Sequence, residues 1–274
     1  MHAISCDKNI CAQCGACVSV CPVKIIHLVE EGSHPTQDPD FEEYCIECGH
    51  CVAVCPTGAF SLDRLSPDDC KAIRKDLQMT PEQVEQLLNA RRSTRAYKEL
   101  TVPRDILEKL LQVGSSAPSA KNVQPWCWIV IQTPGEVRRV ASMVIDWMKS
   151  VIHEMPEAKE TVALRQIVAT WDNNIDRICR GAPHLIIAHA DKNWGFATED
   201  CVLALSHVAL YATSVGLGTC WAGYVYKTIN VYPPLFEALG LPSDHLAYGA
   251  MMVGYPMHTY QRIPPRKQPR IVWR

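Results

Sequence analysis

The stretch that decides the fold of the N-terminal part of this chain is Cys11-Ala12-Gln13-Cys14-Gly15-Ala16-Cys17-Val18-Ser19-Val20-Cys21-Pro22. Its spacing, Cys-x2-Cys-x2-Cys-x3-Cys-Pro, occurs again from Cys45 to Pro56. The two copies agree at eight of twelve positions, among them Gly15 and Gly49. A repeat of this kind predicts two equivalent ligand loops.

The spacing is typical of bacterial proteins with two [4Fe–4S] clusters, in which the fourth cysteine of each run ligates the other cluster. We therefore expect one cluster on Cys11, Cys14, Cys17 and Cys55, and the other on Cys45, Cys48, Cys51 and Cys21. Such tight loops need positive φ angles, which Gly15 and Gly49 adopt easily. Pro22 and Pro56 then direct the chain away, because proline fixes φ and donates no hydrogen bond.

Zinc and disulfide bonds explain these cysteines less well. A zinc site needs four ligands, so it accounts for Cys-x2-Cys pairs but not for a third and fourth cysteine before proline. Disulfides require an oxidising compartment, whereas Met1–Ile10 lacks the basic start and long apolar run of a signal peptide. We expect a reducing cytoplasm. A purely structural role for the clusters stays open.

The overall composition is that of a globular protein, with 47% hydrophobic and 20% charged residues. A net charge of −2 gives no argument for nucleic acid or for a membrane surface as partner. The uncharged stretch 201–226 is long enough to span a bilayer, but it contains Ser206, His207 and a break at Gly216. A buried helix followed by a strand is the expected structure there.

We divide the chain into a two-cluster ferredoxin-like domain (1–62), a helical connector (63–80) and a second domain (81–274). The first domain buries little core, so the clusters must hold it folded. Ser66-Pro67-Asp68-Asp69 predicts a helix start in the connector. Thr80-Pro81-Glu82-Gln83 has the spacing of a capping box and predicts the first helix of the second domain.

The second domain mixes helices and strands, which makes the fold class α+β. The pattern predicts strands at 126–132, 184–190, 221–226 and 245–253, and helices at 103–113, 135–153, 159–178 and 198–215. The 198–215 helix is apolar almost all round, which predicts burial in a core or between subunits. No Gly-x-Gly-x-x-Gly follows a strand, so a Rossmann fold is not supported.

A basic segment, Arg91-Arg92-Ser93-Thr94-Arg95, places three guanidinium groups and two hydroxyls within five residues. Guanidinium groups match phosphate oxygens in geometry and charge. The same arginines could instead cap the negative end of the preceding helix. The residues alone leave both interpretations open.

Residues 81–274 resemble the FMN-dependent nitroreductase family in four ordered segments. Segment 91–95 resembles its flavin-phosphate motif, and Ala117-Pro118-Ser119-Ala120-Lys121-Asn122-Val123-Gln124-Pro125-Trp126 resembles a loop that enters a strand. Segment 216–223 and the pair 254–256 with 265–267 resemble its third and C-terminal signatures. The resemblance implies a central, mostly antiparallel sheet surrounded by helices, and a homodimer with the flavin sites at its interface.

The resemblance also implies a set of cofactor-binding residues: Arg91, Arg92, Ser93, Arg95, Asn122, Gln124, Ala222, Gly223, Arg266 and Lys267. Arg91, Ser93, Arg95, Arg266 and Lys267 would contact the FMN phosphate and ribityl chain, and Arg92 the pyrimidine side. Asn122 would bind the isoalloxazine edge with Gln124 close by. Backbone N–H groups around Ala222 and Gly223 would approach N5. No catalytic residue is assigned.

The remaining cysteines are expected to be buried small hydrophobic residues: Cys6, Cys70, Cys127, Cys179, Cys201 and Cys220. His184 and His189 are five residues apart on one strand, so they face opposite sides and form no metal pair.

These features together predict a cytoplasmic, homodimeric iron–sulfur flavoprotein oxidoreductase. FMN takes two electrons and each [4Fe–4S] cluster carries one, so two clusters on one chain could fill the flavin. The acceptor would be a small molecule such as a nitroaromatic, a quinone or an activated alkene. A ferredoxin or another redox protein is a possible partner, and no nucleic acid or membrane is expected.

Three alternatives stay open. The chain could be an NAD(P)H-dependent nitroreductase that uses NAD(P)H as co-substrate and the clusters as an electron exit. It could be a non-catalytic electron carrier for a larger complex. Oxygen-dependent flavin cleavage also occurs in the superfamily, although oxygen-sensitive clusters argue against it.

Overall fold

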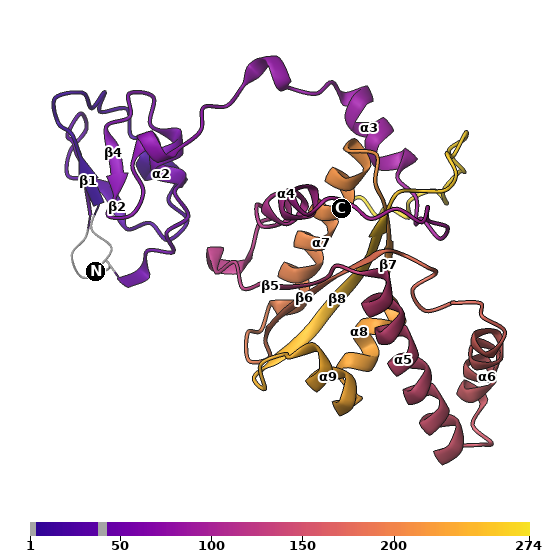
Figure 1. Cartoon of the computed structure of the whole chain (residues 1–274). Helices are drawn as coiled ribbons and strands as arrows, with labels where there is room; N and C mark the ends of the chain where they lie inside the picture. Colours follow the sequence, from indigo (N-terminus) through magenta and orange to yellow (C-terminus); the bar gives the residue numbers. More distant parts are fainter. Residues whose placement is uncertain (1–3, 38–42) are drawn as a thin grey trace. The chain divides into compact units, whose positions relative to one another are not determined.

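The computed structural model describes residues 4–37 and 43–274. The chain forms two compact units (Figure 1). The N-terminal unit contains the residues up to Gln78 and also Ala120–Val123, whereas the second unit contains Met79–Ser119 and Gln124–Arg274. Positions 1–3 and 38–42 of the predicted ferredoxin-like domain lie outside the described residues.

The N-terminal unit consists of short elements around the cysteine runs. Two antiparallel pairs of strands are β1 (Ile4–Cys6) with β4 (Phe60–Leu62) and β2 (Ile26–Leu28) with β3 (Pro35–Gln37). The helices α1 (Ala16–Val20) and α2 (His50–Val54) each begin within a cysteine run. A small core of buried side chains lies between them: Cys17, Cys21, Ile25, Ile26, Cys51, Val52 and Phe60.

The two cysteine runs have the same backbone conformation. Gly15 and Gly49, which precede α1 and α2, have φ angles of 69° and 70°, as expected for tight ligand loops. Gln13 and Glu47 also have positive φ, at 52° and 48°. The sequence repeat is therefore a structural repeat.

The connector contains less helix than predicted. The start expected at Ser66 gives only a 3-10 turn, η2 (Pro67–Asp69), and a second such turn, η3 (Lys75–Leu77), follows. The next α-helix after the connector is α3 (Pro81–Ala90), which has the predicted capping box. The backbone N–H of Gln83 donates to Thr80 Oγ1 at 3.3 Å, and that of Thr80 donates to Gln83 Oε1 at 2.9 Å.

The second unit is built on a four-stranded antiparallel sheet, which confirms the predicted α+β fold (Figure 1). The strand order is β5-β6-β8-β7, with bounds β5 Cys127–Ile131, β6 His184–Asp191, β7 Gly218–Trp221 and β8 His245–Gly254. The strand predicted at 221–226 is wrong beyond Trp221, since Gly223–Ile229 forms the helix α8. Val225, Thr228 and Ile229 are its buried residues, and this spacing suits a helix face.

Helices cover both faces of this sheet. Leu185 and Ile187 of β6 pack in one core with α5 (Pro134–Glu154), α6 (Lys159–Asp172), α8 and α9 (Pro233–Leu239). Ile186 and Ala188 pack in the other core with α4 (Arg104–Gly114) and α7 (Ala197–Ser214). Successive side chains of β6 therefore pack in two different cores, because the pleat of a strand points them to opposite faces of the sheet.

One helix prediction needs adjustment. Helix α6 ends at Asp172 and not at 178, because Asn174 adopts a left-handed φ of 61° and stops the helix. The stretch 201–226 divides into most of α7, then β7 and the first turn of α8. Within residues 4–37 and 43–274, no helix combines the length and the apolar character that crossing a bilayer needs.

His184 begins β6 and is almost fully buried, and its Nε2 accepts a hydrogen bond from the backbone N–H of Val102 at 2.7 Å. Burial lowers the pKa of His184. His184 of the unfolded chain therefore binds a proton near pH 6.5, whereas in the folded chain it does so only at lower pH. The free energy of unfolding should consequently fall as the pH drops, by at most about 1.4 kcal/mol per pH unit for this group.

Denaturant unfolding of the wild type and His184→Gln between about pH 8 and pH 5.5 tests this prediction. Glutamine keeps an acceptor for Val102 but does not titrate, so the variant should lose part of the pH slope. An equal slope in both proteins would contradict it.

Candidate functional site

The structure brings the eight cysteines of the two runs together as two sets. One cavity is lined by Cys11, Cys14, Cys17 and Cys55, with Cys6 beside them, and the other by Cys45, Cys48, Cys51 and Cys21. Each has an empty volume of about 330 Å³. These are the sets predicted from the crossover of the fourth cysteine, so each run contributes three thiols to one cavity and one thiol to the other.

The surroundings of the thiols differ within each cavity. Burial raises the pKa of Cys51 to about 11 and also raises the pKa values of Cys17 and Cys45. Burial opposes ionisation of Cys55 too, but hydrogen bonds from Thr57 and from backbone N–H groups lower its pKa below the usual value. The N–H of Ala59 donates to Cys55 Sγ at 3.2 Å. Metal ligation would have to remove protons from the buried thiols.

The basic segment lines a separate cavity in the second unit. Its lining residues are Arg91, Arg92, Ser93, Arg95, Tyr260 and Arg266, and its empty volume is about 610 Å³. Four arginines and two hydroxyl-bearing residues thus line one hollow. Arg91 is also the C-cap of α3, so the helix-capping interpretation and the phosphate interpretation of this segment are compatible.

Hydrogen bonds to the sheet hold this basic segment in place. The N–H of Thr94 donates to the carbonyl of Thr219 in β7 at 2.9 Å, and the Tyr97 hydroxyl donates to the carbonyl of Thr94 at 2.8 Å. Tyr97 is buried, which raises the pKa of its hydroxyl and keeps it a donor. The N–H of Lys98 donates to the carbonyl of Tyr255 just after β8. The arginines therefore project from a fixed backbone.

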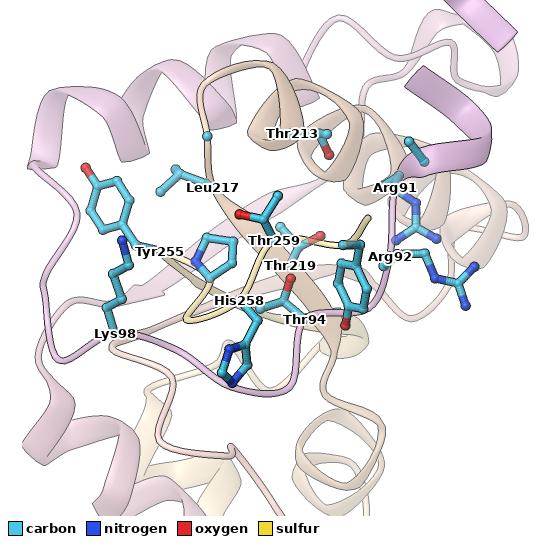
Figure 2. A pocket seen from close by; sticks show the side chains of 15 residues that line it. Arg91, Arg92, Thr94, Lys98, Thr213, Leu217, Thr219, Tyr255, His258 and Thr259 are labelled. Atoms are coloured by element: carbon cyan, nitrogen blue, oxygen red, sulfur yellow. The ribbon is translucent and has the colours of Figure 1, made fainter. Parts of the chain in front are cut away.

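A larger hollow of about 890 Å³ shares Arg91, Arg92 and Tyr260 with the arginine cavity. Figure 2 shows Arg91 and Arg92 at one end of it and Lys98 and Tyr255 at the other. Hydroxyl-bearing side chains lie between these ends: Thr94, Thr219 and Thr259. The hollow is cationic at both ends and offers hydrogen-bonding groups along its length.

The other predicted cofactor residues do not line these two hollows. Lys267 is exposed on the C-terminal tail. Ala222 is buried, and its N–H donates to the carbonyl of Ala250 at 2.7 Å. Gly223 is the first residue of α8, where backbone N–H groups have no acceptor within the helix. Gln124 follows the 120–123 segment, and its N–H donates to Ser119 Oγ at 2.9 Å.

Asn122 has a partner that the sequence did not predict. Its Nδ2 donates to the carbonyls of Ile46 at 3.3 Å and Glu47 at 3.1 Å, within the N-terminal unit. Ile46 and Glu47 lie between Cys45 and Cys48 of the second run. The role of Asn122 at a flavin edge stays a prediction, while its amide contacts a loop of the second cysteine cavity.

Sequence reasoning missed Tyr260, Thr94 and Tyr97 as parts of the site. The sequence indicates only a hydroxyl at Thr94, and no local signal shows that Tyr97 supports this residue. The prediction that the six remaining cysteines are buried was only partly right. Cys179, Cys201 and Cys220 are buried, Cys6 and Cys70 are partly buried, and Cys127 is exposed at the start of β5 because the edge of the sheet leaves it uncovered.

Comparison with known families gives two matches. The model of the nitroreductase family matches residues 88–255, more than half of the chain. A model of a 4Fe–4S dicluster domain matches residues 10–74. The residue ranges of the two matches correspond to the two structural units.

Individual relatives are distant. A Methanothermobacter thermautotrophicus protein provisionally named NADH dehydrogenase/NAD(P)H nitroreductase is 23% identical over 66% of this chain and 81% of its own length. Mouse iodotyrosine deiodinase 1 is 26% identical over 66% of this chain and 65% of its own length. A Bacteroides fragilis nitroreductase structure with bound FMN has a TM-score of 0.57 at 24% identity, covering 69% of this chain and 95% of that chain. This similarity of structure shows the fold.

Gly218 allows the basic segment to lie against β7. A Cβ at this position would meet the Thr94 side chain at 2.2–2.8 Å, and Thr94 is buried. We therefore expect Gly218→Ala to destabilise the protein by about 1–3 kcal/mol through overpacking. Thermal unfolding measures this, with Gly195→Ala as the matched control, since a Cβ there would meet no atom within 4 Å beyond its chain neighbours. Equal melting temperatures for the two variants would contradict the prediction.

Proposed function

Because this chain belongs to the nitroreductase family, we propose that it is an FMN-dependent oxidoreductase in which electrons pass between two [4Fe–4S] clusters and FMN. The acceptor is an organic molecule such as a nitroaromatic, a quinone or an activated alkene. The observation that carries the proposal is the convergence of four arginines and Ser93 on one cavity. The same chain forms two cavities, each lined by one predicted set of four cysteines, and Cys6 also lines the first.

The arginine cavity fits the phosphate of FMN. Guanidinium groups bind phosphate oxygens in pairs of parallel hydrogen bonds, and several of them can neutralise a dianion. Arg91, Arg92 and Arg95 come from one segment and Arg266 from the C-terminal tail, so the phosphate is held from both ends of the domain sequence. Ser93 adds a hydroxyl donor.

The cysteine cavities fit [4Fe–4S] clusters. The four thiols of a predicted set line each cavity, and backbone N–H groups point at sulfur, as those of Gln13 and Ala59 do at Cys11 and Cys55. Such hydrogen bonds and the apolar side chains around the cluster set its reduction potential. Val52 and Phe60 are almost completely buried in this core and exclude water from it.

When bound, FMN supplies two-electron chemistry and each cluster supplies one-electron transfer. The residues of the chain bind and orient these groups. The anchored 93–98 backbone fixes where the arginines hold a phosphate, and the shared wall of Arg91, Arg92 and Tyr260 places the larger hollow beside it. Hydrogen bonds from Asn122 hold the loop between Cys45 and Cys48, which carries ligands of the second cluster.

We also propose a homodimer in a reducing cytoplasm. Helix α7 leaves Val202 and Leu203 about 40% exposed, at 38% and 41%, which is an apolar surface that a second copy would cover. A reducing compartment keeps the cluster thiols available for iron.

A second candidate function follows from the names of relatives. The Methanothermobacter thermautotrophicus relative is provisionally named NADH dehydrogenase/NAD(P)H nitroreductase, so a nicotinamide could reduce the flavin here and the clusters could serve as the exit. The two functions differ in which group is reduced first.

Removing two arginines tests the phosphate site. We expect Arg91→Gln with Arg266→Gln to lower FMN affinity by at least about 100-fold, because each charge-assisted hydrogen bond contributes about 1.5–3 kcal/mol. Iron content and cluster absorbance should stay unchanged. FMN content after gel filtration measures the effect, and Arg104→Gln, which removes an exposed arginine of α4, is the control. Full FMN retention by the double variant would exclude the assignment.

Anaerobic stopped-flow absorbance tests the direction of electron flow. Reduced ferredoxin should bleach the clusters first and the flavin second. In Asn122→Ala the second phase should slow by about tenfold, which corresponds to about 1.4 kcal/mol in the barrier. Asn89→Ala, on the exposed surface of α3, should behave as the wild type. Bleaching of the flavin first by NADH or NADPH would favour the second candidate function.

A further inference from the structure

Three side chains of the sheet form a cluster outside the cavities described above. They are Cys127 at the start of β5, His189 near the end of β6 and His245 at the start of β8. Their ligand atoms, Cys127 Sγ and one ring nitrogen of each histidine, all lie within 4.8 Å of one another. The cluster combines one sulfur and two imidazoles, the donor set that borderline-soft metal ions prefer.

A β-bulge brings His245 to the same side of the sheet as the other two residues. From His184 to Ala188, β6 pairs with Val253 to Gly249, but His189 pairs with Ala247, so Tyr248 is an extra residue on β8. Without this extra residue His245 would face the opposite side, because a slip of one residue reverses every side chain. Cys127 pairs directly with His189 in β5.

The two histidines already contact each other through the atoms that would bind a metal. Their Nδ1 atoms are 2.9 Å apart, so one ring donates and the other accepts. Burial, together with the nearby His245, lowers the pKa of His189 and favours the neutral ring. Neutral imidazole is the form that ligates metals.

The geometry needs little change to reach tetrahedral coordination. With Zn–N distances of about 2.05 Å and a Zn–S distance of about 2.3 Å, ligand atoms lie about 3.3 Å (N to N) and about 3.6 Å (N to S) apart. The histidine pair must therefore open by about 0.4 Å, and the sulfur must approach by at most about 1.2 Å. Cys127 is exposed and can rotate towards the pair.

We propose that Cys127, His189 and His245 form a binding site for Zn²⁺ at this end of the sheet. The Cys127 thiol releases its proton to solvent, and the histidine that donates in the Nδ1–Nδ1 bond moves its proton to Nε2. Both Nδ1 atoms and the thiolate then bind the ion. Water fills the fourth position, because the Cys127 side of the cluster is open to solvent.

The bound ion links three neighbouring strands of the sheet. The ligands come from β5, β6 and β8, which are consecutive in the strand order. An ion that binds only the folded chain stabilises it in proportion to the logarithm of its concentration. None of the three residues lines the cysteine or arginine cavities, so occupation of the site is independent of the proposed oxidoreductase activity.

Zinc titration of the fully loaded protein tests the site. The wild type, with complete iron and FMN content, should bind one Zn²⁺ per chain and melt at a higher temperature with zinc present. Cys127→Ser and His245→Ala should each weaken zinc binding by at least about tenfold. His153→Ala, which removes an exposed histidine at the end of α5, should bind zinc as the wild type does.

Isothermal titration and metal analysis after gel filtration measure binding, and iron content shows that zinc has not displaced the clusters. Cys127→Ser changes one exposed atom, so it keeps the test valid if His245→Ala folds poorly. Absence of zinc uptake by the wild type, or equal affinity in the wild type and Cys127→Ser, would overturn the proposal.

Discussion

The N-terminal unit depends on thiol ligation, because it has little apolar material of its own. Its core cluster has seven buried members, and three of these, Cys17, Cys21 and Cys51, are cysteines that face the two cavities. Folding of this unit is therefore coupled to ligand binding, as in other small metal domains. The crossover of the fourth cysteine ties the two runs to each other, so neither cavity is complete without both halves of the repeat. This explains why the repeat is also seen in backbone angles.

Positive φ angles at residues other than glycine occur in the cysteine loops and in the loop that contacts one of them. Gln13 and Glu47 adopt positive φ inside the cysteine loops, and Lys121, Asn122 and Gln124 do so in the loop that contacts the second run. Residues other than glycine rarely adopt this backbone conformation, and each instance costs on the order of 1–3 kcal/mol. The strain in the first pair orients backbone N–H groups around sulfur. In the 120–124 loop it turns the Asn122 amide towards the carbonyls of Ile46 and Glu47.

The fold was largely predictable where the pattern is local. Capping residues located α3, and the apolar runs located β5, β6, β8 and α7 within a few residues. Prediction failed where tertiary contacts decide: the aromatic and β-branched residues after Trp221 favour a strand, but Val225 and Ile229 are buried at helical spacing and form α8. For the candidate site, the spacing of the cysteines predicted both cavities. Tyr260 could not be found, because nothing in its own surroundings indicates that the tail passes the arginines.

The histidines of the sheet show most clearly what a sequence leaves undetermined. His184 and His189 do lie apart on β6, since the first binds the N–H of Val102 and the second contacts His245. The partner of His189 comes from a strand more than fifty residues away, and it is on the correct side only because Tyr248 adds one residue to β8. Pairing register is a property of the folded sheet. A single bulge therefore decides whether three metal-binding side chains meet or point in different directions.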